Sequence, residues 1–336
     1  MSADERLPRI FVTGAGGPSA ISILRAMRHA PATLLAGDID PYAAGLYLVP
    51  AEHRALLPRG DDPHLTDELL ALCERRAVDV LVPTVDTELL PLARERDRFA
   101  AAGVTLVVAQ EDTLSVCLDK AALAERCSGA VHVPLTIVVD AAFDPAACTL
   151  PVIVKPRSGS GSRGIRLLER REELDALERD STLLVQQHLP GPEYSLDVLA
   201  RADGRVVAVV PRERLKVDSG IAVTGRTLHD PRLDTFARRV AELIGLTTVA
   251  NVQVKEDGAG EPALLEVNPR FPGTMPLTVA SGVDMPALAI GEALGRPIPD
   301  GPLAFEDIAM VRYFEERFFP FDDIDDLRRN AARIAS

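Results

Sequence analysis

The chain has 336 residues, of which 47% are hydrophobic and 26% are charged, and its formal net charge is −13. A chain of this length can form two or three domains, each with its own core. The negative charge argues against nucleic acid as a partner, because a polyphosphate backbone would be repelled. No signal peptide opens the chain and no apolar run reaches the roughly 18 residues of a membrane helix, so we expect a cytoplasmic protein without a membrane partner.

The cysteines and histidines do not suggest a metal centre or a disulfide framework. Cys73, Cys117, Cys127 and Cys148 show no Cys-x-x-Cys spacing, and the six histidines form no His-x-x-x-His pair. We therefore expect neither a zinc site nor structural disulfides.

The N-terminal third alternates short apolar strands with helix-like segments. A helix is expected over residues 20–27, and strands are expected at residues 9–13, 34–38, 78–82 and 104–108. This order predicts a doubly wound parallel sheet in a first domain over residues 1–112. The turn Gly14-Ala-Gly16-Gly17 and the later Asp38 suggest dinucleotide binding, but the third glycine of that fingerprint is missing, and we do not favour this interpretation.

Three polar residues, Thr84, Asp86 and Glu88, follow the strand at residues 78–82. Open α/β sheets bind ligands at the carboxyl ends of their strands, which makes these side chains candidate ligand contacts. The alternative is structural, because a capping residue and acidic side chains stabilise the positive end of a helix. We favour the structural interpretation.

A glycine-rich hairpin follows in the middle of the chain. The apolar run at residues 150–156 carries Lys155 at its end, and the loop Arg157-Ser-Gly-Ser-Gly-Ser-Arg-Gly164 leads into a strand at residues 165–168. Such a loop can lay backbone N–H groups over phosphates, while Lys155 supplies a positive charge. It is not a P-loop, because no Gly-Lys-Ser/Thr ends it and no helix follows. A surface hairpin without a ligand is the alternative.

Residues 183–198 form a strand, a Pro-Gly break and a second strand. Backbone groups of the connecting segment could pair with an adenine edge, and Glu193 could accept both ribose hydroxyls, although a solvated turn would give the same pattern. Five cations then follow in an acidic chain, which suggests an anion site or a solvated basic face. They are Arg212, Arg214, Lys216, Arg226 and Arg270.

The apolar run at residues 263–268 ends in a carboxylate and an amide. On a strand, Glu266 and Asn268 share one face about 7 Å apart. Asn251 and Gln253, on the preceding apolar run, offer further oxygen ligands. Mg²⁺ prefers a few protein oxygens together with phosphate and water, and Arg270 could hold an anion beside it. The alternative is a strand end with solvated polar residues.

Taken together, these segments resemble ATP-grasp enzymes. The similarity rests on Lys120, the hairpin at residues 155–164, and the segments 186–193, 251–253 and 266–270, and it covers roughly residues 9 to 300. It is strongest to the carbamoyl-phosphate-synthase large-chain branch and its single-copy relatives that join carboxylates to amines. The resemblance implies an α/β and α+β fold with a pre-ATP-grasp domain (1–112), a lid domain (113–188) and a central antiparallel-sheet domain (189–336).

The resemblance also implies roles for individual residues. Lys120, Lys155 and the hairpin residues Ser158, Gly159, Ser160, Gly161, Ser162 and Gly164 would contact the phosphates of ATP. The adenine would meet Gln186, Gln187, His188 and Leu189, and the ribose would meet Glu193. Magnesium or manganese ions would bind Gln253, Glu266 and Asn268. Arg214, Lys216 and Arg226 would recognise a substrate carboxylate, and Arg270 would hold the acyl phosphate, so that Glu266, Asn268 and Arg270 form the catalytic group.

The implied activity is ATP-dependent joining of a small carboxylate, such as an amino acid, to an amine through an acyl phosphate. The alternatives are activation of bicarbonate, a nucleotide-binding module without catalysis, and a nicotinamide oxidoreductase. The resemblance makes a homodimer plausible. Beyond residue 300, five of the ten phenylalanines lie between Phe305 and Phe321, which suggests core packing, a dimer contact or a pocket wall, and residues 308–314 could form a strand.

Overall fold

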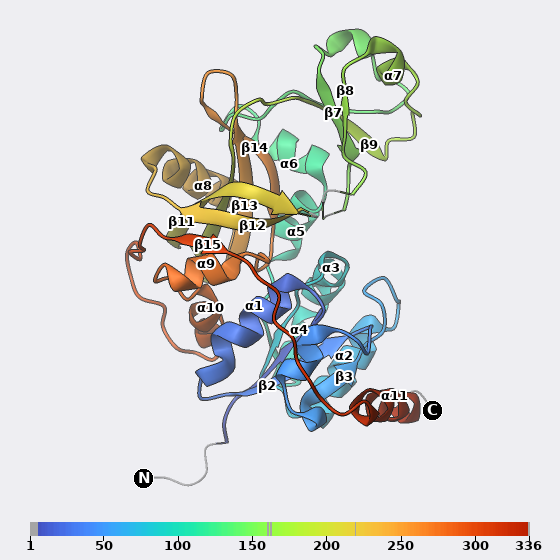
Figure 1. The fold of residues 1–336 in the computed structure, drawn as a ribbon, viewed down its shortest axis with the longest axis vertical. Coiled ribbons are helices and arrows are strands. Elements are labelled where there is room, and N and C mark those ends of the chain that lie inside the picture. Colours follow the sequence, from blue (N-terminus) through green and yellow to red (C-terminus); the bar gives the residue numbers. More distant parts are fainter. Residues whose placement is uncertain (1–5, 160, 162, 219, 335–336) are drawn as a thin grey trace.

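The computed structural model describes residues 6–159, 161, 163–218 and 220–334 (Figure 1). These residues form a five-stranded, a six-stranded and a four-stranded sheet. In Figure 1 the N-terminal sheet lies at one end of the molecule, the small sheet at the other, and the six-stranded sheet between them.

The N-terminal sheet is parallel, with the strand order β3-β2-β1-β4-β5. Its strands are β1 (Arg9–Val12), β2 (Thr33–Asp38), β3 (Arg54–Leu56), β4 (Val80–Val82) and β5 (Thr105–Leu106). Its helices are α1 (Pro18–Ala26), α2 (Leu65–Arg75), α3 (Asp86–Arg94) and α4 (Arg96–Ala101), with short 3₁₀ turns at Met27–His29, Ala44–Leu48 and Ala51–His53. The expected strands are confirmed. The order reverses between β1 and β4, which is where doubly wound sheets open a crevice.

The four-stranded sheet is antiparallel and carries the glycine-rich hairpin between β7 and β8. Its strands are β6 (Thr136–Val138), β7 (Val152–Pro156), β8 (Arg166–Leu168) and β9 (Leu183–Gln187), with α7 (Arg171–Asp175) and a 3₁₀ turn at Pro145–Ala147. Two predicted phosphate contacts, Ser160 and Ser162, lie outside the described residues. We refer to this sheet and its hairpin as the lid.

The six-stranded sheet is antiparallel, in the order β14-β13-β10-β11-β12-β15. Its strands are β10 (Glu193–Ala200), β11 (Val206–Asp218), β12 (Ile221–Thr227), β13 (Val249–Glu256), β14 (Pro262–Asn268) and β15 (Ala309–Val311). The neighbouring helices are α5 (Glu111–Cys117), α6 (Lys120–Cys127), α8 (Pro231–Leu243), α9 (Met275–Ala280) and α10 (Met285–Ala293). We refer to it as the central sheet.

One buried core joins the N-terminal domain to the central sheet. Ile23 of α1, Met275 of α9 and Leu199 of β10 belong to the same cluster of buried apolar side chains. A second cluster packs α8 and α6 on the opposite face of the central sheet, where Leu196 and Val252 are fully buried. The first cluster therefore fixes the carboxyl ends of β1 and β4 against the central sheet.

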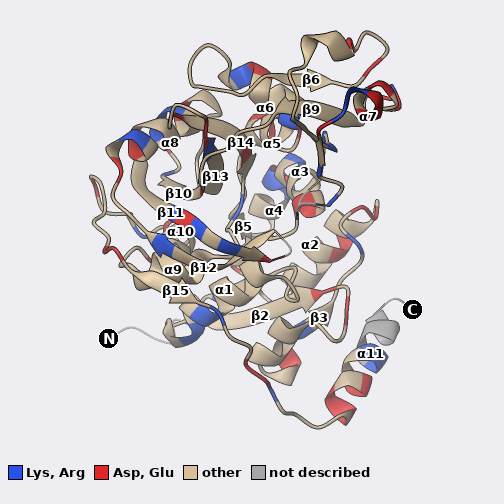
Figure 2. Ribbon diagram, turned by 45° about the horizontal axis from the view of Figure 1, so that its top comes forward, with Lys and Arg blue, Asp and Glu red and all other residues tan. Residues whose placement is uncertain are grey.

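The C-terminal segment crosses the surface of the N-terminal domain and ends in α11 (Asp322–Ile334), which lies beside β3 (Figure 1). Its first turn is acidic (Figure 2), and Arg54 Nη1 donates to Asp323 Oδ2 at 3.1 Å.

Core packing, one of the alternatives left open for the five phenylalanines of this segment, holds only for Phe305, which is half-buried against the first cluster, whereas the other four are exposed. Phe314 and Phe318 are 97% and 93% exposed, because the segment runs as a single strap with its outer side open. Phe319 stacks on Tyr47, with ring centroids 3.8 Å apart.

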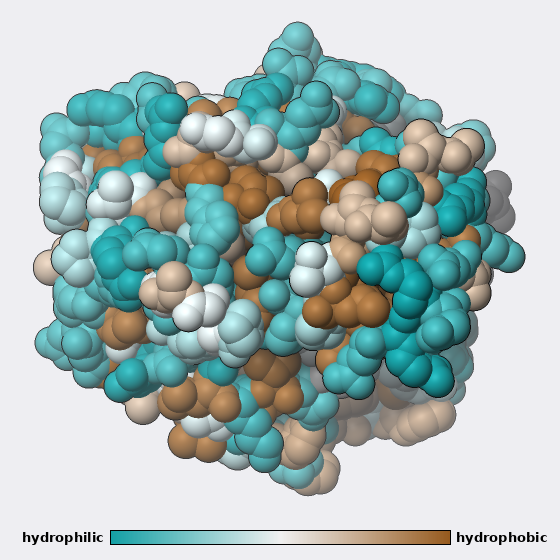
Figure 3. All heavy atoms as spheres, turned by 90° about the horizontal axis from the view of Figure 1, so that it is seen from above, coloured by the Kyte–Doolittle hydropathy of each residue, from teal (hydrophilic) through white to brown (hydrophobic). Residues whose placement is uncertain are grey.

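The surface at the lid end mixes hydrophobic and hydrophilic residues (Figure 3). Among the described helices, none combines the length and apolar character needed to cross a membrane.

Candidate active site

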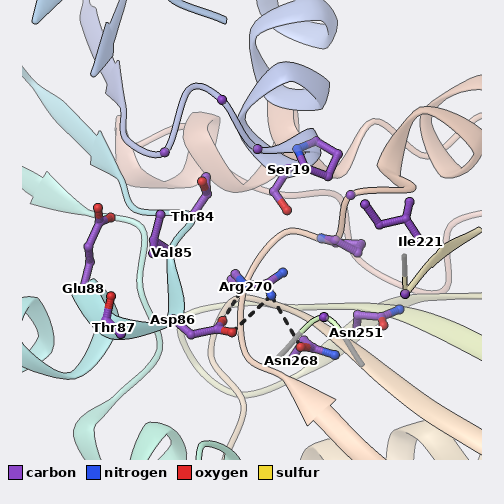
Figure 4. A pocket seen from close by; sticks show the side chains of 18 of the residues that line it. Ser19, Thr84, Val85, Asp86, Thr87, Glu88, Ile221, Asn251, Asn268 and Arg270 are labelled. Atoms are coloured by element: carbon purple, nitrogen blue, oxygen red, sulfur yellow. Dashed lines mark hydrogen bonds and ion pairs between the residues drawn. The ribbon is translucent and has the colours of Figure 1, made fainter. Parts of the chain in front are cut away.

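Two cavities meet between the three sheets. The larger, of about 670 Å³, lies between the carboxyl ends of the N-terminal strands and the central sheet (Figure 4). The smaller, of about 200 Å³, lies between the lid and the central sheet and is lined by Lys120, Lys155 and Glu193. Both cavities are lined by Arg163, Arg214, Gln253 and Glu266. A ligand in one cavity would therefore meet a ligand in the other at these side chains.

The predicted metal ligands lie together at this junction. Glu266 and Asn268 share one face of β14, and Asn268 Nδ2 donates to Glu266 Oε1 at 3.3 Å. Gln253 is the register partner of Glu266 on β13, and Asn251 is the partner of Asn268. All four side chains line the larger cavity.

The amide of Gln253 offers a test of whether a cation fits here. With its nitrogen toward Glu266, it donates to Oε1 at 3.2 Å and its oxygen accepts from Arg214 Nη1 at 3.2 Å. With its oxygen toward Glu266, two oxygens face each other at that spacing, which suits a cation between them. Among the described residues, no cluster of three or more His, Cys, Asp or Glu side chains forms a metal site. The oxygens of Glu266, Asn268 and Gln253 are a donor set that fits Mg²⁺, with its remaining ligands taken from phosphate and water.

Two lysines flank Glu266. Lys155 Nζ donates to Gln186 Oε1 at 2.9 Å and to the Leu265 carbonyl at 3.3 Å. Burial lowers the pKa of Lys155 to about 8, and the nearby Glu266 carboxylate opposes that effect. Lys120 Nζ donates to the Gly159 carbonyl at 2.7 Å and lies 3.8 Å from Glu266 Oε2. Two ammonium groups beside one carboxylate leave positive charge available for an anion.

Lys120 is positioned by an ion pair that sequence reasoning missed. Asp119 caps α6 by accepting from the amides of Ala121 and Ala122 at 2.9 and 3.3 Å. The same carboxylate accepts from Arg157 Nη2 at 2.6 Å, at the base of the hairpin. The start of α6 is therefore tied to the lid.

Of the four residues predicted to contact adenine, Gln186 contacts Lys155 at the site, whereas the other three lie outside both cavities. Gln186 is 4% exposed, and its amide nitrogen donates to Thr136 Oγ1 at 2.9 Å while its oxygen accepts from Lys155. Its side chain therefore holds the lysine. Gln187, His188 and Leu189 continue from the end of β9 and do not line either cavity as described.

Glu193, the predicted ribose contact, lines the smaller cavity. Its Oε1 lies 3.2 Å from Arg214 Nη1, and Arg214 Nη2 donates to the Gly220 carbonyl at 2.9 Å. A ribose at this position would have to compete with Arg214 for the carboxylate.

Arg270 reaches across to the N-terminal domain. Its Nε donates to Asp86 Oδ1 at 2.6 Å, and its Nη2 lies 3.5 Å from Asn268 Oδ1 (Figure 4). Asp86 begins α3 and lies in its acidic first turn, as the favoured structural interpretation expects, although the N-cap residue Val85 makes no side-chain capping hydrogen bond. Asp86 binds Arg270 because the two domains meet here.

Thr84 and Glu88 face the same cavity, and Glu88 also stands in the first turn of α3, as the structural interpretation expects. Glu88 Oε2 accepts from Thr13 Oγ1 at 2.5 Å, and Thr84 Oγ1 donates to the Thr13 carbonyl at 2.8 Å. Burial raises the pKa of Glu88 to about 7, and the negative charge of Asp38 adds to the rise.

Two of the predicted substrate cations are not brought to the site. A register shift between Arg214 and Lys216 interrupts the alternation of β11, and Lys216 is exposed. Arg226 Nε donates to Glu213 Oε2 at 2.7 Å, outside the larger cavity. Arg214 and Arg270 are the two that line it.

A buried ionic network under the larger cavity was not identified from the sequence. Asp197 is fully buried, and its Oδ1 accepts from Arg212 Nη2 at 2.5 Å and from Asn251 Nδ2 at 2.8 Å. Its Oδ2 accepts from Thr278 Oγ1 at 2.5 Å, and Arg212 also donates to Thr274 Oγ1. The network fixes Asn251 below the site, so that it acts as a support.

Family models match two parts of the chain. A model for the ATP-grasp domain in the biosynthetic pathway with the Ter operon matches residues 179–316, and a model for the PylC-like N-terminal domain matches residues 10–107. A parallel N-terminal sheet, a lid with a glycine-rich hairpin and a central antiparallel sheet around a polar junction are the architecture of this class. Residues 179–316 thus match an ATP-grasp family model, and the fold of the chain is that of the ATP-grasp enzymes.

Curated relatives match the chain in part. A D-alanine–D-alanine ligase of Ectopseudomonas mendocina is 31% identical over 178 residues, which is 48% of this chain and 55% of that protein. A carbamoyl phosphate synthase large chain of Thermomicrobium roseum is 28% identical over 227 residues, which is 60% of this chain. The chain spans about a fifth of the length of that synthase, 21%.

Solved structures share the fold. An ADP complex of PurK, an N5-carboxyaminoimidazole ribonucleotide synthetase, superposes with a TM-score of 0.72 at 15% identity, covering 98% of this chain and 86% of that one. The biotin carboxylase domain of 2-oxoglutarate carboxylase from Hydrogenobacter thermophilus, solved with MgADP and bicarbonate, has a TM-score of 0.71 at 18% identity, covering 90% and 73%. At these identities the likeness establishes the fold.

Proposed function

We propose that this chain is an ATP- and Mg²⁺-dependent ligase that joins a carboxylate to an amine through an acyl phosphate and releases ADP and phosphate. The observation that carries the proposal is the meeting of two cavities at Glu266 and Gln253. One cavity has the lysines that suit polyphosphate, and the other is large enough for two small substrates. A carboxylate in the larger cavity would lie beside the terminal phosphate of the nucleotide.

On the nucleotide side, Lys120 and Lys155 would bind the phosphates, and the hairpin would cover them with backbone N–H groups. Gln186 would act as a positioning residue, because it accepts from Lys155 Nζ at 2.9 Å. The Glu193 carboxylate would release Arg214 and accept hydrogen bonds from the ribose hydroxyls instead. Gln187, His188 and Leu189 stay predicted adenine contacts on the resemblance to the family.

Gln253, Glu266 and Asn268 would hold Mg²⁺, with Gln253 turning its amide oxygen toward Glu266. Bound there, the metal would neutralise the negative charge that builds on the transferred phosphoryl group. Both related solved structures named above contain ADP, and that of the biotin carboxylase domain contains it as the magnesium salt.

The chemistry has two steps. A carboxylate oxygen attacks the γ-phosphorus, the bond to the bridging oxygen breaks, and ADP leaves. The amine nitrogen then attacks the acyl carbon, loses a proton, and phosphate leaves as the acyl C–O bond breaks. Arg270, held by Asp86 at 2.6 Å, would bind the acyl phosphate through charge-assisted hydrogen bonds worth about 1.5–3 kcal/mol each. Closure of the lid would keep water from the intermediate.

Activation of bicarbonate is the second candidate, because carbamoyl phosphate synthases and carboxylases are among the proteins that the chain resembles. Those proteins differ from this chain in length, and the chain spans 21% of the synthase of T. roseum. The two candidates differ in one requirement, since only the second needs bicarbonate.

The test is a phosphate-release screen with ATP, Mg²⁺ and the common amino acids, singly and in pairs, in buffer depleted of bicarbonate. We expect ADP, phosphate and an amide in equal amounts only when an acid and an amine are both present. Glu266→Gln should reduce turnover at least a hundredfold. Glu213→Gln, which removes a carboxylate paired with Arg226 outside the larger cavity, is the matched control and should retain wild-type turnover.

Three results would argue against the ligase. Turnover that depends on bicarbonate would favour the second candidate, and ADP binding without turnover for any pair would favour a binding module. A product formed with NADH and no response to Mg-ATP would revive the oxidoreductase.

The assembly and place of action are part of the proposal. We propose a homodimer, as the H. thermophilus biotin carboxylase domain is described as a dimer, and action in the cytoplasm, where Mg-ATP is supplied. Light scattering of the purified chain tests the first point.

A further inference from the structure

The N-terminus of α1 opens into the larger cavity without a cap from the protein. Gly17 is the capping residue and has no side chain, Pro18 stands at the first helical position, and no acidic residue occupies the first turn. The Ile21 amide donates to the Gly17 carbonyl at 3.1 Å, whereas the amides of Ser19 and Ala20 find no acceptor within the described part of the chain. Free first-turn amides and the helix dipole favour an anion.

The side chain of Ser19 supplies a second, independent observation. Ser19 is 6% exposed, and its hydroxyl has no hydrogen-bond partner among the residues that the structure describes. Figure 4 shows the hydroxyl pointing into the cavity. The next serine of the helix, Ser22, behaves in the usual way and donates to the Pro18 carbonyl at 2.6 Å. Ser19 is a buried residue whose unpartnered hydroxyl opens into the cavity beside two free amides, and this arrangement can bind a ligand.

The charges around this site favour a carboxylate over a phosphate. Asp38 Oδ2 accepts from the Gly16 amide at 2.7 Å, close to the start of α1, and Asp40 lines the same cavity. Arg59 is paired with Asp61 at 3.0 Å. The described lining of the larger cavity carries six carboxyl side chains and four arginines, so a dianion would meet more negative than positive charge here.

The position of the site favours the amine substrate. The carboxylate that is activated must lie at Glu266 and Arg270 on the central-sheet side, and its phosphate must point toward the nucleotide. The amine then approaches the acyl carbon from the rest of the cavity, which is the side on which Ser19 lies (Figure 4). A negative group on the amine substrate would reach α1.

We propose that the N-terminus of α1 and the Ser19 hydroxyl bind the carboxylate of the acceptor amine, so that the acceptor is an amino acid. This inference rests on the proposed ligase function. It predicts that the product is a peptide-like amide with a free carboxylate.

The test is Ser19→Asp, which places a carboxylate of the protein where the substrate carboxylate would bind. An acidic residue in the first turn also favours the helix, so the variant should fold and its thermal midpoint should not fall. With the acceptor found in the screen, KM for the amino acid should rise at least tenfold, while KM for ATP should change less than twofold. The decarboxylated amine, such as ethylamine in place of alanine, should be a poor acceptor for the wild type. Its rate of ligation should fall little further in the variant.

The matched control is Thr66→Asp. Thr66 occupies the same second position in α2, outside both cavities of the candidate site, and this variant should keep wild-type kinetics. Three results would overturn the inference. The first is that the wild type uses alanine and ethylamine equally well as acceptors. The second is that KM rises equally for both acceptors in Ser19→Asp. The third is that Ser19→Asp raises KM only for the acid that is activated.

Binding can be followed without turnover. In the presence of Mg-ADP, L-alanine should shift the backbone amide resonances of Ser19 and Ala20, while ethylamine should not. Shifts with inorganic phosphate instead of L-alanine would contradict the carboxylate assignment. If L-alanine shifts these resonances but no pair of substrates is ligated, the carboxylate site at α1 stands and the proposed ligase function is refuted. If ligation occurs without these shifts, the ligase function stands and the carboxylate site at α1 is refuted.

Discussion

Lys155 allows a quantitative test of the nucleotide side of the site. The side chain is 5% exposed, and burial lowers its pKa from 10.5 to about 8. One pKa unit corresponds to about 1.4 kcal/mol, so holding this ammonium in the folded protein without an anion costs about 3 kcal/mol. The charged form of Lys155 therefore destabilises the folded protein when no anion is bound, and a bound polyphosphate would stabilise it.

The sign of the pH dependence follows from linkage. At pH 7 the lysine is protonated in the folded and the unfolded chain, and the folded state bears the whole cost. As the pH rises from about 8 toward 10.5, the folded protein releases this proton first. The free energy of unfolding therefore rises as the pH rises from about 8 to 10.5, and the same amount is lost as the pH falls from 10.5 to about 8.

The perturbation is Lys155→Met, which keeps a long apolar stem and removes the charge. The difference in free energy of unfolding between variant and wild type should fall by about 2–3 kcal/mol between pH 7 and 10.5, because only the wild type gains stability there. The lost hydrogen bond to Gln186 does not depend on pH over this range and cancels. Urea denaturation without nucleotide, in half-unit pH steps, measures the difference, and Lys216→Met, at an exposed lysine, is the control.

A stability difference that stays constant across this range would refute the reasoning, since it would mean that Lys155 is not buried as a charge. The same charge should respond to the nucleotide. At pH 8.5 Mg-ATP binding should take up a proton in the wild type but not in Lys155→Met, which calorimetry in buffers of different ionisation enthalpy detects.

Two further predictions concern buried carboxylates. Burial raises the pKa of Glu88 from 4.5 to about 7, so its contribution to stability is full below pH 4.5 and is lost as the pH rises through about 7. Glu88→Gln should thus gain up to about 3 kcal/mol relative to wild type between pH 4.5 and 8 in urea denaturation, and no gain would contradict the burial of this carboxyl. Asp197→Ala should cost about 3–5 kcal/mol of unfolding free energy, because it leaves Arg212, which is 1% exposed, without its carboxylate. Asp197→Leu combined with Arg212→Met should cost clearly less, and an equal cost would show that the charge is not the cause.

The sequence predicted the strands of this fold well because buried strands are continuous apolar runs. Phe11 and Leu81, on β1 and β4, are 1% and 0% exposed. The edge strand β3 was missed, since it has only three residues, Arg54–Leu56, all half-buried.

The candidate site was predictable where its residues are neighbours in one strand. Glu266 and Asn268 lie on one face because side chains alternate along β14. Contacts across the fold could not be predicted in this way. Asp86 and Arg270 are 184 residues apart, so local helix chemistry predicted the acidic first turn of α3 but not the ion pair that Asp86 also makes. The irregularity that separates Lys216 from Arg214 left no local signal in the sequence.

The central claim is that Glu266 and Asn268 hold magnesium where the two cavities meet. A crystal structure of the chain with Mg²⁺ and a non-hydrolysable ATP analogue tests it most directly. We expect both side chains to bind the metal beside the phosphates, Lys120 and Lys155 to contact phosphate oxygens, and the hairpin to lie over them. Glu266 and Asn268 turned away from the bound metal would contradict it.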